Sequence, residues 1–418
     1  MYRKYLAGFL ATVIALLVVC AGVVYGIDPS FQYHLPYGNI KAVYLNERYQ
    51  NAGLAKNLEY DTVILGSSVT ANFRLSQFNE LFDAQTVKLT FPGGCFSDFE
   101  TALNLCFETH DVKRVFWSID PKILMTPYDE EPTPLPEYLY NFNPFDDVKY
   151  LFNKDVLLEQ CGESILATLS GEGQSLDDAF TWDTKYEFSH EHALWSYVRP
   201  DWEEEPQPAD AYDDIIDQNL ECVLSFVKAH PDTEFYLMTP PYSMLYWDRI
   251  LRDGSYTAVL KLYDRLLEEL PQYENVHYYC FAVDEVTIPL GNYTDEVHFS
   301  GEISRYLAEY MAKNDGMTAD DMPAMHAFFR DIVENYDFDS MFPESVRDNP
   351  RRVRTLPDDY CPHSPGHLAG GFFCVQTQNK KTPNAWFGVF FPGGAGGIRT
   401  HGRFHPSNDF ESFFACDF

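Results

Sequence analysis

The sequence predicts an α/β fold, a three-layer sandwich with a mostly parallel sheet, preceded by one transmembrane helix. Short apolar runs of strand length alternate with stretches of helical periodicity between residues 59 and 345. Strands that alternate with helices form a mostly parallel sheet covered on both faces. A further apolar run, without any charge, stands at residues 5–26 and predicts the membrane helix.

The N-terminal run has the length of a membrane anchor. As a helix, its 22 residues (5–26) would reach about 33 Å, which is enough to cross the hydrocarbon core of a bilayer. Arg3 and Lys4 precede the run, and cations at this end favour a cytoplasmic N-terminus with the globular domain outside the cell membrane. The alternatives are a cleaved signal peptide and a lipoprotein signal at Cys20, and the length of the run favours the uncleaved anchor.

We expect four segments along the chain. Residues 1–28 form the cytoplasmic N-terminus and the anchor, residues 29–58 form a connector with Pro and Gly breakers, and residues 59–345 form the globular domain. Residues 346–418 are rich in Gly, Pro and Phe and show no amphipathic period. We interpret them as a disordered tail or as a spurious read-through past the usual end of the reading frame, with a genuine Gly-rich tail as the alternative.

Composition excludes some classes of function. A formal net charge of −33 argues against binding to nucleic acid, whose phosphates require clustered Lys and Arg. The cysteines form no CxxC pair and the histidines form no HxH or HExxH pattern, so we expect no metal site and no cofactor. Buried free thiols are expected at five scattered cysteines of the globular domain: Cys95, Cys106, Cys161, Cys222 and Cys280.

The elements of the globular domain follow from its apolar pattern. Strands are predicted at Asp61–Gly66, Thr86–Leu89, Val112–Ile119, Glu234–Met238 and Val276–Tyr279. Helices are predicted at about 70–82, from a capping box at Ser97–Glu100 onward, and at about 210–230, 256–270 and 300–313.

The alternation of strands and helices stops between about residues 121 and 209. This aromatic-rich stretch is interpreted as an insertion or cap over the sheet and not as a separate domain. Its aromatic side chains suit core and lid packing, the commoner use, or stacking on sugar rings. They are Tyr138, Tyr140, Phe142, Trp182, Trp195, Tyr197 and Trp202.

Three short motifs supply the residue types of a serine nucleophile site. Gly66-Ser67-Ser68 directly follows a buried strand, and parallel sheets bind ligands at this carboxyl edge. Gly93 and Gly94 follow the second strand, and glycine amides can approach a developing oxyanion closely. Asp295 precedes His298 by three residues, a spacing that lets the carboxylate orient the imidazole. Each motif alone is more often structural, whereas their order along the chain is informative.

That order resembles the SGNH/GDSL hydrolase superfamily over roughly residues 60–313. It is most similar to the membrane-anchored branch that contains the teichoic-acid D-alanyl transfer protein and exopolysaccharide acetylation proteins. The resemblance implies a flavodoxin-like sheet, with Ser68 as the nucleophile and with Asp295 and His298 completing the triad. Ser67 stands where the family usually has Asp, a replacement that the membrane-anchored branch tolerates.

The oxyanion hole is where the sequence departs from the family. The resemblance assigns the oxyanion to the amides of Ser68 and Gly93, with Gly94 as the second choice. The family adds an Asn side chain after the third strand, and Asp120 stands there instead. An ionised Asp120 would repel the oxyanion, so it points elsewhere, is protonated or has another role. Tyr242 follows a later strand and is a candidate for lining the site, with a plain turn as the commoner alternative.

The resemblance implies a membrane-anchored, extracytoplasmic serine esterase or O-acyltransferase that acts on acyl groups of cell-envelope glycan or teichoic-acid-like polymers. Asp120 favours acyl transfer over free esterase activity. Expected partners are the acylated polymer, the membrane itself and a polytopic membrane acyltransferase. The alternative is a catalytically silenced binding or scaffold module in an envelope assembly. A metal-dependent hydrolase has little support in the sequence.

Overall fold

The computed structural model describes residues 2–130, 133–202 and 205–342 of the chain. At its centre is a five-stranded sheet in the order β2-β1-β3-β4-β5, in which every neighbouring pair is parallel. This order is the flavodoxin-like one, so the predicted fold class is confirmed. The strands are β1 (Thr62–Gly66), β2 (Thr86–Thr90), β3 (Arg114–Ser118), β4 (Glu234–Thr239) and β5 (Val276–Cys280).

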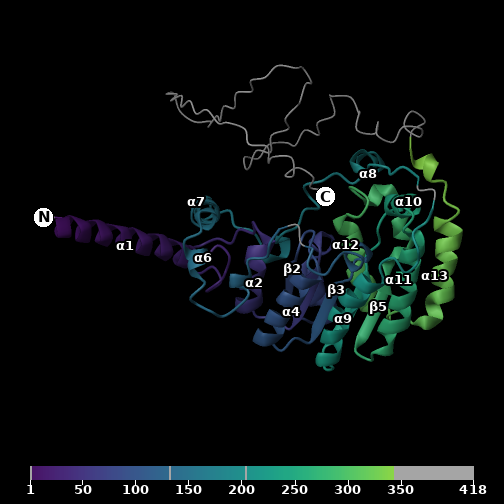
Figure 1. The fold of residues 1–418 in the computed structure, drawn as a ribbon, viewed down its shortest axis with the longest axis horizontal. Coiled ribbons are helices and arrows are strands. Elements are labelled where there is room, and N and C mark those ends of the chain that lie inside the picture. The colour runs from purple at the N-terminus through teal and green to yellow at the C-terminus, as the bar shows by residue number, and fades with distance from the viewer. Residues whose placement is uncertain (1, 131–132, 203–204, 343–418) are drawn as a thin grey trace, which may run out of the picture. The chain divides into compact units, whose positions relative to one another are not determined.

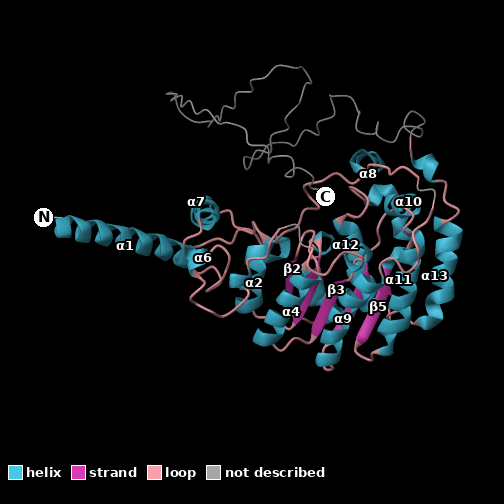
Figure 2. Cartoon of the chain, in the orientation of Figure 1, coloured by secondary structure: helices cyan, strands magenta, loops and turns pink. Residues whose placement is uncertain are grey.

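Helices cover both faces of the sheet (Figure 2). α3 and α12 pack together on one face, and α4, α9 and α11 lie on the other. The sheet domain contains α2 (Glu47–Asn57), α3 (Leu75–Phe82), α4 (Phe96–Thr109), α9 (Asp213–Ala229), α10 (Met244–Arg252), α11 (Tyr256–Glu269), α12 (Gly301–Lys313) and α13 (Met322–Phe328). The insertion contains α5 (Pro121–Leu124), α6 (Val148–Leu151), α7 (Cys161–Ser170) and α8 (His190–Ser196).

Two neighbouring residues of β3 show how the layers are held together. Phe116 and Trp117 point to opposite faces of the sheet, as successive strand residues do. The Phe116 ring packs on Phe78 of α3, with centroids 4.8 Å apart. The Trp117 ring packs on Phe99 of α4 and Phe226 of α9, at 6.1 and 6.2 Å. Both faces of the strand are therefore buried, which explains its continuous apolar sequence.

All five predicted strands are confirmed, with ends that differ by no more than two residues. The helix expected from residue 70 begins later, at Leu75, because Ser68–Thr70 form a 3₁₀ turn and Arg74 is extended. The capping box predicted at Ser97–Glu100 is wrong. α4 begins two residues earlier than that box implies, and Cys95 is its N-cap, with its backbone N–H donating to Asp98 at 3.3 Å.

The segment expected to be a connector contains α2, which packs on α4 and β2. Polar residues make up part of its buried surface, so the sequence shows no clear apolar period there. Arg48 pairs with Asp98 at 2.8 Å, and Asn51 donates to the carbonyl of Thr90 at 2.8 Å. Gln50 donates to the carbonyl of Val43 at 2.8 Å. These bonds satisfy side-chain N–H donors that would otherwise be costly to bury.

The N-terminal run forms α1 (Tyr2–Ile27), a helix long and apolar enough to cross a membrane (Figure 1). The five cysteines expected as buried free thiols are all free and buried, which confirms that prediction for the described part of the chain. The predicted tail at 346–418, and residues 343–345 of the expected domain, lie outside the described residues.

Candidate active site

Ser68, His298 and Asp295 form a hydrogen-bonded relay at the carboxyl edge of the sheet. Ser68 Oγ lies 2.7 Å from His298 Nε2, and His298 Nδ1 lies 2.7 Å from Asp295 Oδ2. The serine comes from the turn after β1, and the other two residues come from the loop before α12. The imidazole and carboxylate side chains are 14% and 17% exposed. The structure thus brings together the three residues that the motifs single out, and their catalytic roles stay a prediction.

Close packing at Gly66 shapes the turn that presents the serine. A Cβ at this position would lie 2.6 Å from Thr70 Cγ2 and 2.9 Å from Ser118 Cβ, so a larger residue would displace the turn. The Thr70 amide and hydroxyl both donate to the carbonyl of Ser67, at 3.1 and 2.9 Å. The strand therefore ends in a tight 3₁₀ turn with Ser68 at its start.

A buried lysine holds the segment that follows this turn. Lys88, on β2, donates from Nζ to the carbonyls of Ala71 and Phe73, at 2.5 and 2.8 Å. Burial lowers the pKa of Lys88 to about 7. Lys88 is not among the residues that the sequence motifs single out, although a charge in the middle of a short, otherwise uncharged strand is a readable signal.

Asp295 is held as an ionised acceptor by its own loop. Its Oδ1 accepts the backbone N–H groups of Val297 and His298, at 2.9 and 2.8 Å, while Oδ2 faces the imidazole. Burial opposes the charge, but the hydrogen bonds from His298 and from the two amides outweigh burial and lower the pKa of Asp295 from its ordinary 3.8. An ionised Asp295 favours the proton on Nδ1 and leaves Nε2 to accept from Ser68.

The three candidate oxyanion amides, those of Ser68, Gly93 and Gly94, differ in whether they already donate a hydrogen bond. The Gly94 amide donates to the carbonyl of Phe91 at 2.7 Å and closes the turn after β2. The amides of Gly93 and Ser68 donate to no other described residue. Gly93 has a φ of 60°, which glycine adopts without strain and which this turn requires. Gly93 is therefore favoured over Gly94, the second choice of the sequence analysis.

Asp120 binds hydroxyl groups behind the nucleophile turn. Its Oδ2 accepts from Ser67 Oγ at 2.5 Å, and its Oδ1 accepts from Ser118 Oγ. Burial raises the pKa of Asp120 above its ordinary 3.8, although hydrogen bonds from Ser118, Ser67 and Tyr242 oppose the rise. Tyr242 is itself buried and meets the site through this carboxylate. Of the alternatives open for Asp120, the geometry favours another role, which is to position Ser67 beside Ser68.

Trp182, from the insertion, lies over the relay. Its ring meets the His298 ring edge-on, with centroids 5.2 Å apart, and its Nε1 donates to the carbonyl of Ser68 at 3.1 Å. The sequence placed Trp182 among the lid aromatics and gave no sign of this contact, because 114 residues separate it from Ser68.

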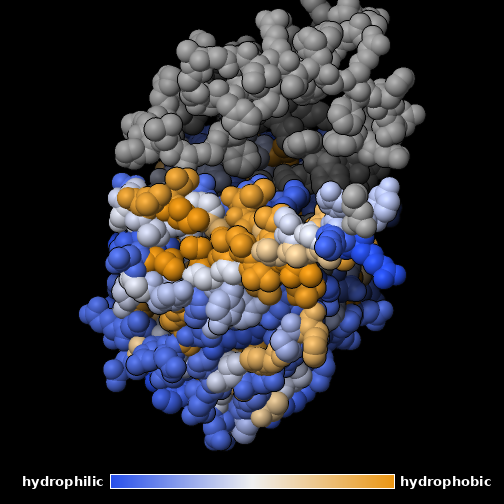
Figure 3. Space-filling model, turned by 90° about the vertical axis from the view of Figure 1, so that its left-hand side faces the viewer, coloured by the Kyte–Doolittle hydropathy of each residue, from blue (hydrophilic) through white to orange (hydrophobic). Residues whose placement is uncertain are grey.

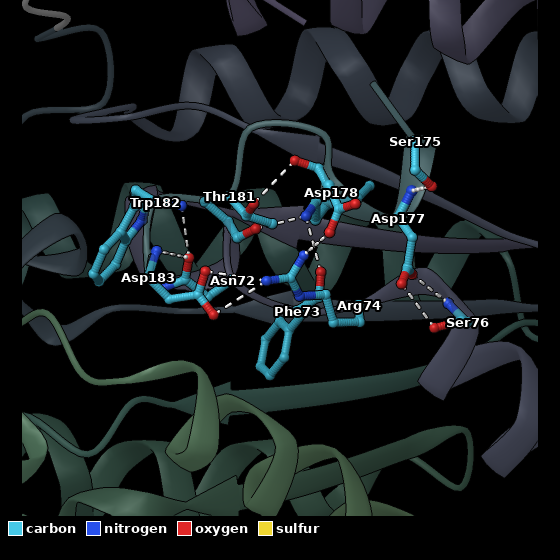
Figure 4. A network of polar contacts seen from close by, with 12 residues as sticks. Asn72, Phe73, Arg74, Ser76, Ser175, Asp177, Asp178, Thr181, Trp182 and Asp183 are labelled. Atoms are coloured by element: carbon cyan, nitrogen blue, oxygen red, sulfur yellow. Dashed lines mark hydrogen bonds and ion pairs between the residues drawn. The ribbon is translucent and has the colours of Figure 1, made fainter. Parts of the chain in front are cut away.

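A polar network fastens the insertion to the segment after the nucleophile (Figure 4). Asn72 Oδ1 accepts the backbone N–H groups of Trp182 and Asp183, at 3.0 and 3.1 Å. Arg74 pairs with Asp178, and with Asp183 at 3.1 Å. The backbone at Trp182 and Asp183 is thus held by Asn72 and Arg74, which follow Ser68 in the chain.

The other insertion aromatics range from buried to exposed, and Tyr138 is half-buried. Tyr140 and Tyr197 are buried, as core packing requires. Phe142, Trp195 and Trp202 are at least half exposed, at 57, 50 and 64%. Trp182 is thus the insertion aromatic that the structure places in contact with the relay.

A cavity of 870 Å³ lies beside the relay, between α3 and the start of α12. Its lining includes Asn72, Arg74, Asp183, Ser300 and Arg305 but none of the three relay residues. It mixes cations with carboxylates, and Arg74 already pairs with Asp183. We assign this cavity no substrate. Within the described ranges, no group of three or more His, Cys, Asp or Glu side chains is placed to hold a metal ion.

Comparisons with known proteins give no evidence about the role of this site. No protein-family model matches the chain, and no curated protein matches it. One similar solved structure, from Streptococcus pneumonia, carries the provisional name of a platelet activating factor. The two share 15% identity over 64% of this chain and 88% of the other, with a TM-score of 0.32. A likeness this distant carries no argument about function.

Proposed function

We propose that the chain is a membrane-anchored, extracytoplasmic serine acyl-esterase or O-acyltransferase that acts on acyl groups of cell-envelope glycan or teichoic-acid-like polymers. The observation that carries the proposal is the unbroken relay from Ser68 Oγ through His298 to Asp295, with both heavy-atom distances at 2.7 Å. Nucleophile, base and orienting carboxylate within hydrogen-bond reach are the arrangement of an activated serine.

In the proposed reaction, His298 Nε2 takes the proton from Ser68 Oγ as the oxygen attacks the acyl carbonyl. The amides of Ser68 and Gly93 donate to the oxyanion of the tetrahedral intermediate, and neither amide donates to another described residue. The imidazolium then gives its proton to the leaving alcohol, and the acyl group remains on Ser68. Water or a glycan hydroxyl next loses a proton to His298 and accepts the acyl group, which restores the serine.

The proposed location rests on α1 and on the charges before it. Arg3 and Lys4 precede an apolar helix of membrane-spanning length, which favours an N-terminus in the cytoplasm and a catalytic domain outside. An anchored domain meets polymers of the envelope more readily than free metabolites. A polytopic membrane acyltransferase is the partner that would supply the acyl group to such a domain.

A catalytically silenced binding module is the second candidate, and Asp120 is the observation that favours it. A carboxylate in the place of an oxyanion-donating Asn removes one donor from the site. The relay distances weigh against silencing, since a site under no demand for catalysis has no need to keep Ser68, His298 and Asp295 in line.

Activity of the full-length chain in phospholipid nanodiscs decides between the two candidates. We expect hydrolysis of p-nitrophenyl acetate and covalent labelling by a fluorophosphonate probe, both abolished by Ser68→Ala. The matched control is Ser67→Ala, which removes a neighbouring hydroxyl that takes no part in the relay. Absence of labelling in the folded wild-type protein, or labelling that survives Ser68→Ala, would sink the enzymatic proposal.

A further inference from the structure

α7 and the turn before it carry an exposed apolar stripe. Leu158, Ile165, Leu166 and Leu169 are 72, 40, 60 and 80% exposed. Spacings of three and four residues place the last three on one side of the helix. Cys161 and Ser164, on the neighbouring side of α7, are buried. A soluble protein rarely leaves such a contiguous stripe to water, so the stripe indicates an interaction surface.

Polar contacts hold α7 against the segment that follows α1. Ser30 Oγ donates to Gln160 Oε1 at 3.2 Å just before α7, and the Lys41 amide donates to Thr168 Oγ1 at 3.0 Å near its end. α7 also packs on α1 itself. Figure 1 shows α7 end-on while α1 runs across the picture, so the two helices lie crosswise.

The geometry points to α7 as an interfacial helix that rests on the outer surface of the lipid bilayer, with its apolar stripe at the boundary of head groups and acyl chains. A helix that lies crosswise to a membrane-spanning helix, at the outer end of that helix, runs along the membrane plane. The inference rests on the proposed span of α1. Figure 3 looks at the side from which α1 projects and shows apolar residues gathered there.

Exposed aromatic residues lie near the end of α1 and next to α6. Tyr25 and Tyr37, at the end of α1 and shortly after it, are 55 and 56% exposed. Phe142 and Phe145 stand just before α6, which also packs on α1, and are 57 and 86% exposed. Exposed tyrosines at the end of a membrane helix are typical of the membrane–water interface. Exposed phenylalanine side chains suit insertion into the same boundary.

Lipid suits this stripe better than a protein partner does. The stripe is uncharged and belongs to a helix that packs on α1, and Glu159 and Glu163 border it without interrupting it. An uncharged apolar face with a polar border inserts into the interface without any shape-matched pocket. Two attachments, one across the membrane and one along it, hold the domain at a fixed tilt and the relay at a fixed height.

Photo-crosslinking of the full-length chain in phosphatidylglycerol and phosphatidylethanolamine nanodiscs tests the inference. Benzoyl-phenylalanine replaces Leu166 in the stripe, Leu16 in the proposed span, or Glu221 on α9. Leu16 and Glu221 are 60 and 68% exposed, so both tolerate the larger group. By mass spectrometry we expect lipid adducts from the Leu166 and Leu16 positions, and at least about tenfold fewer from Glu221.

The outcomes separate this inference from the anchor on which it rests. Adducts from Leu16 and none from Leu166, in protein that keeps the wild-type thermal transition, overturn the interfacial helix and leave the anchor standing. Adducts from neither position contradict the membrane span as well. A protein crosslinked through Leu166 in native membranes, in place of lipid, assigns the stripe to a protein partner and also overturns the inference.

Discussion

Two carboxylates, Asp295 and Asp120, lie near the nucleophile turn, and their surroundings shift their pKa values in opposite directions. In the loop before α12, Asp295 accepts two backbone amides and faces an imidazole, and its pKa is lowered. In the turn after β3, Asp120 is more deeply buried and its pKa is raised despite hydrogen bonds from hydroxyl groups. Amides and an imidazole outweigh burial where neutral hydroxyls do not.

This difference indicates different roles for Asp295 and Asp120. Asp295 is built to stay charged and to orient His298. Asp120 is built to hold Ser67 and Ser118, which brace the turn on which Ser68 stands. A change at Asp295 should therefore damage chemistry, and a change at Asp120 should chiefly damage the fold of the turn.

The largest expected loss of activity follows from a change at Ser68, the proposed nucleophile. Ser68→Ala removes the attacking oxygen, and we expect hydrolysis of p-nitrophenyl acetate to fall on the order of 10⁵- to 10⁶-fold. Ser67→Ala takes one hydroxyl from Asp120 and should cost about tenfold or less in the same assay. Equal losses from the two variants would mean that Ser68 is not the nucleophile.

Asp295→Asn is expected to lower kcat by about 10⁴-fold, because an amide at this position no longer enforces the Nδ1–H tautomer or stabilises the imidazolium. Steady-state kinetics of the purified variant measure the loss. Retention of most of the activity would show that His298 is oriented by some other group.

Asp120→Asn should lower activity by about tenfold or less and the free energy of unfolding by about 1–2 kcal/mol, because one of the bonded hydroxyls must reverse its direction. Kinetics and urea unfolding of the same preparation report the two effects. A loss of activity as large as that of Asp295→Asn would make Asp120 part of the chemistry and break the contrast.

The pH dependence of stability should have opposite signs at the two sites. The pKa of Asp295 is lowered, so its stabilising contribution is present above pH 3.8 and is lost as the pH falls through the lowered value. The pKa of Asp120 is raised, so its contribution is present below pH 3.8 and is lost as the pH rises through the raised value.

Urea unfolding at a series of pH values measures both effects as differences from the Asn variants. With rising pH, the advantage of wild type over Asp295→Asn should grow, and its advantage over Asp120→Asn should shrink. Differences that move in the same direction would contradict the assignment of the two environments.

The smallest effect is expected at the lid. Trp182→Phe keeps a ring beside His298 but removes the hydrogen bond from Nε1 to the Ser68 carbonyl, which should cost about 1 kcal/mol in kcat/KM. Trp195→Phe, at a half-exposed position on α8, should leave kcat/KM unchanged. A loss at Trp195 equal to that at Trp182 would show that the lid contact is not specific.

Elements with an apolar period were predictable, and elements with buried polar faces were not. β3 was readable because both of its faces pack against helices, which leaves a continuous apolar run. α2 was missed because Arg48, Gln50 and Asn51 are buried through hydrogen bonds and an ion pair. A buried polar residue depends on a partner that sequence periodicity does not reveal.

By itself, the sequence determined α1, the strands, and the order of the motifs that carry Ser68, Asp295 and His298. Each of these depends on residues close together in the sequence, either as an apolar run or as a spacing of a few positions. Tertiary structure alone decided that Trp182 lies over His298 and that Asp120 turns to Ser67. It also set the pKa shifts of the two carboxylates in opposite directions, because burial and donors arise from segments far apart in the chain.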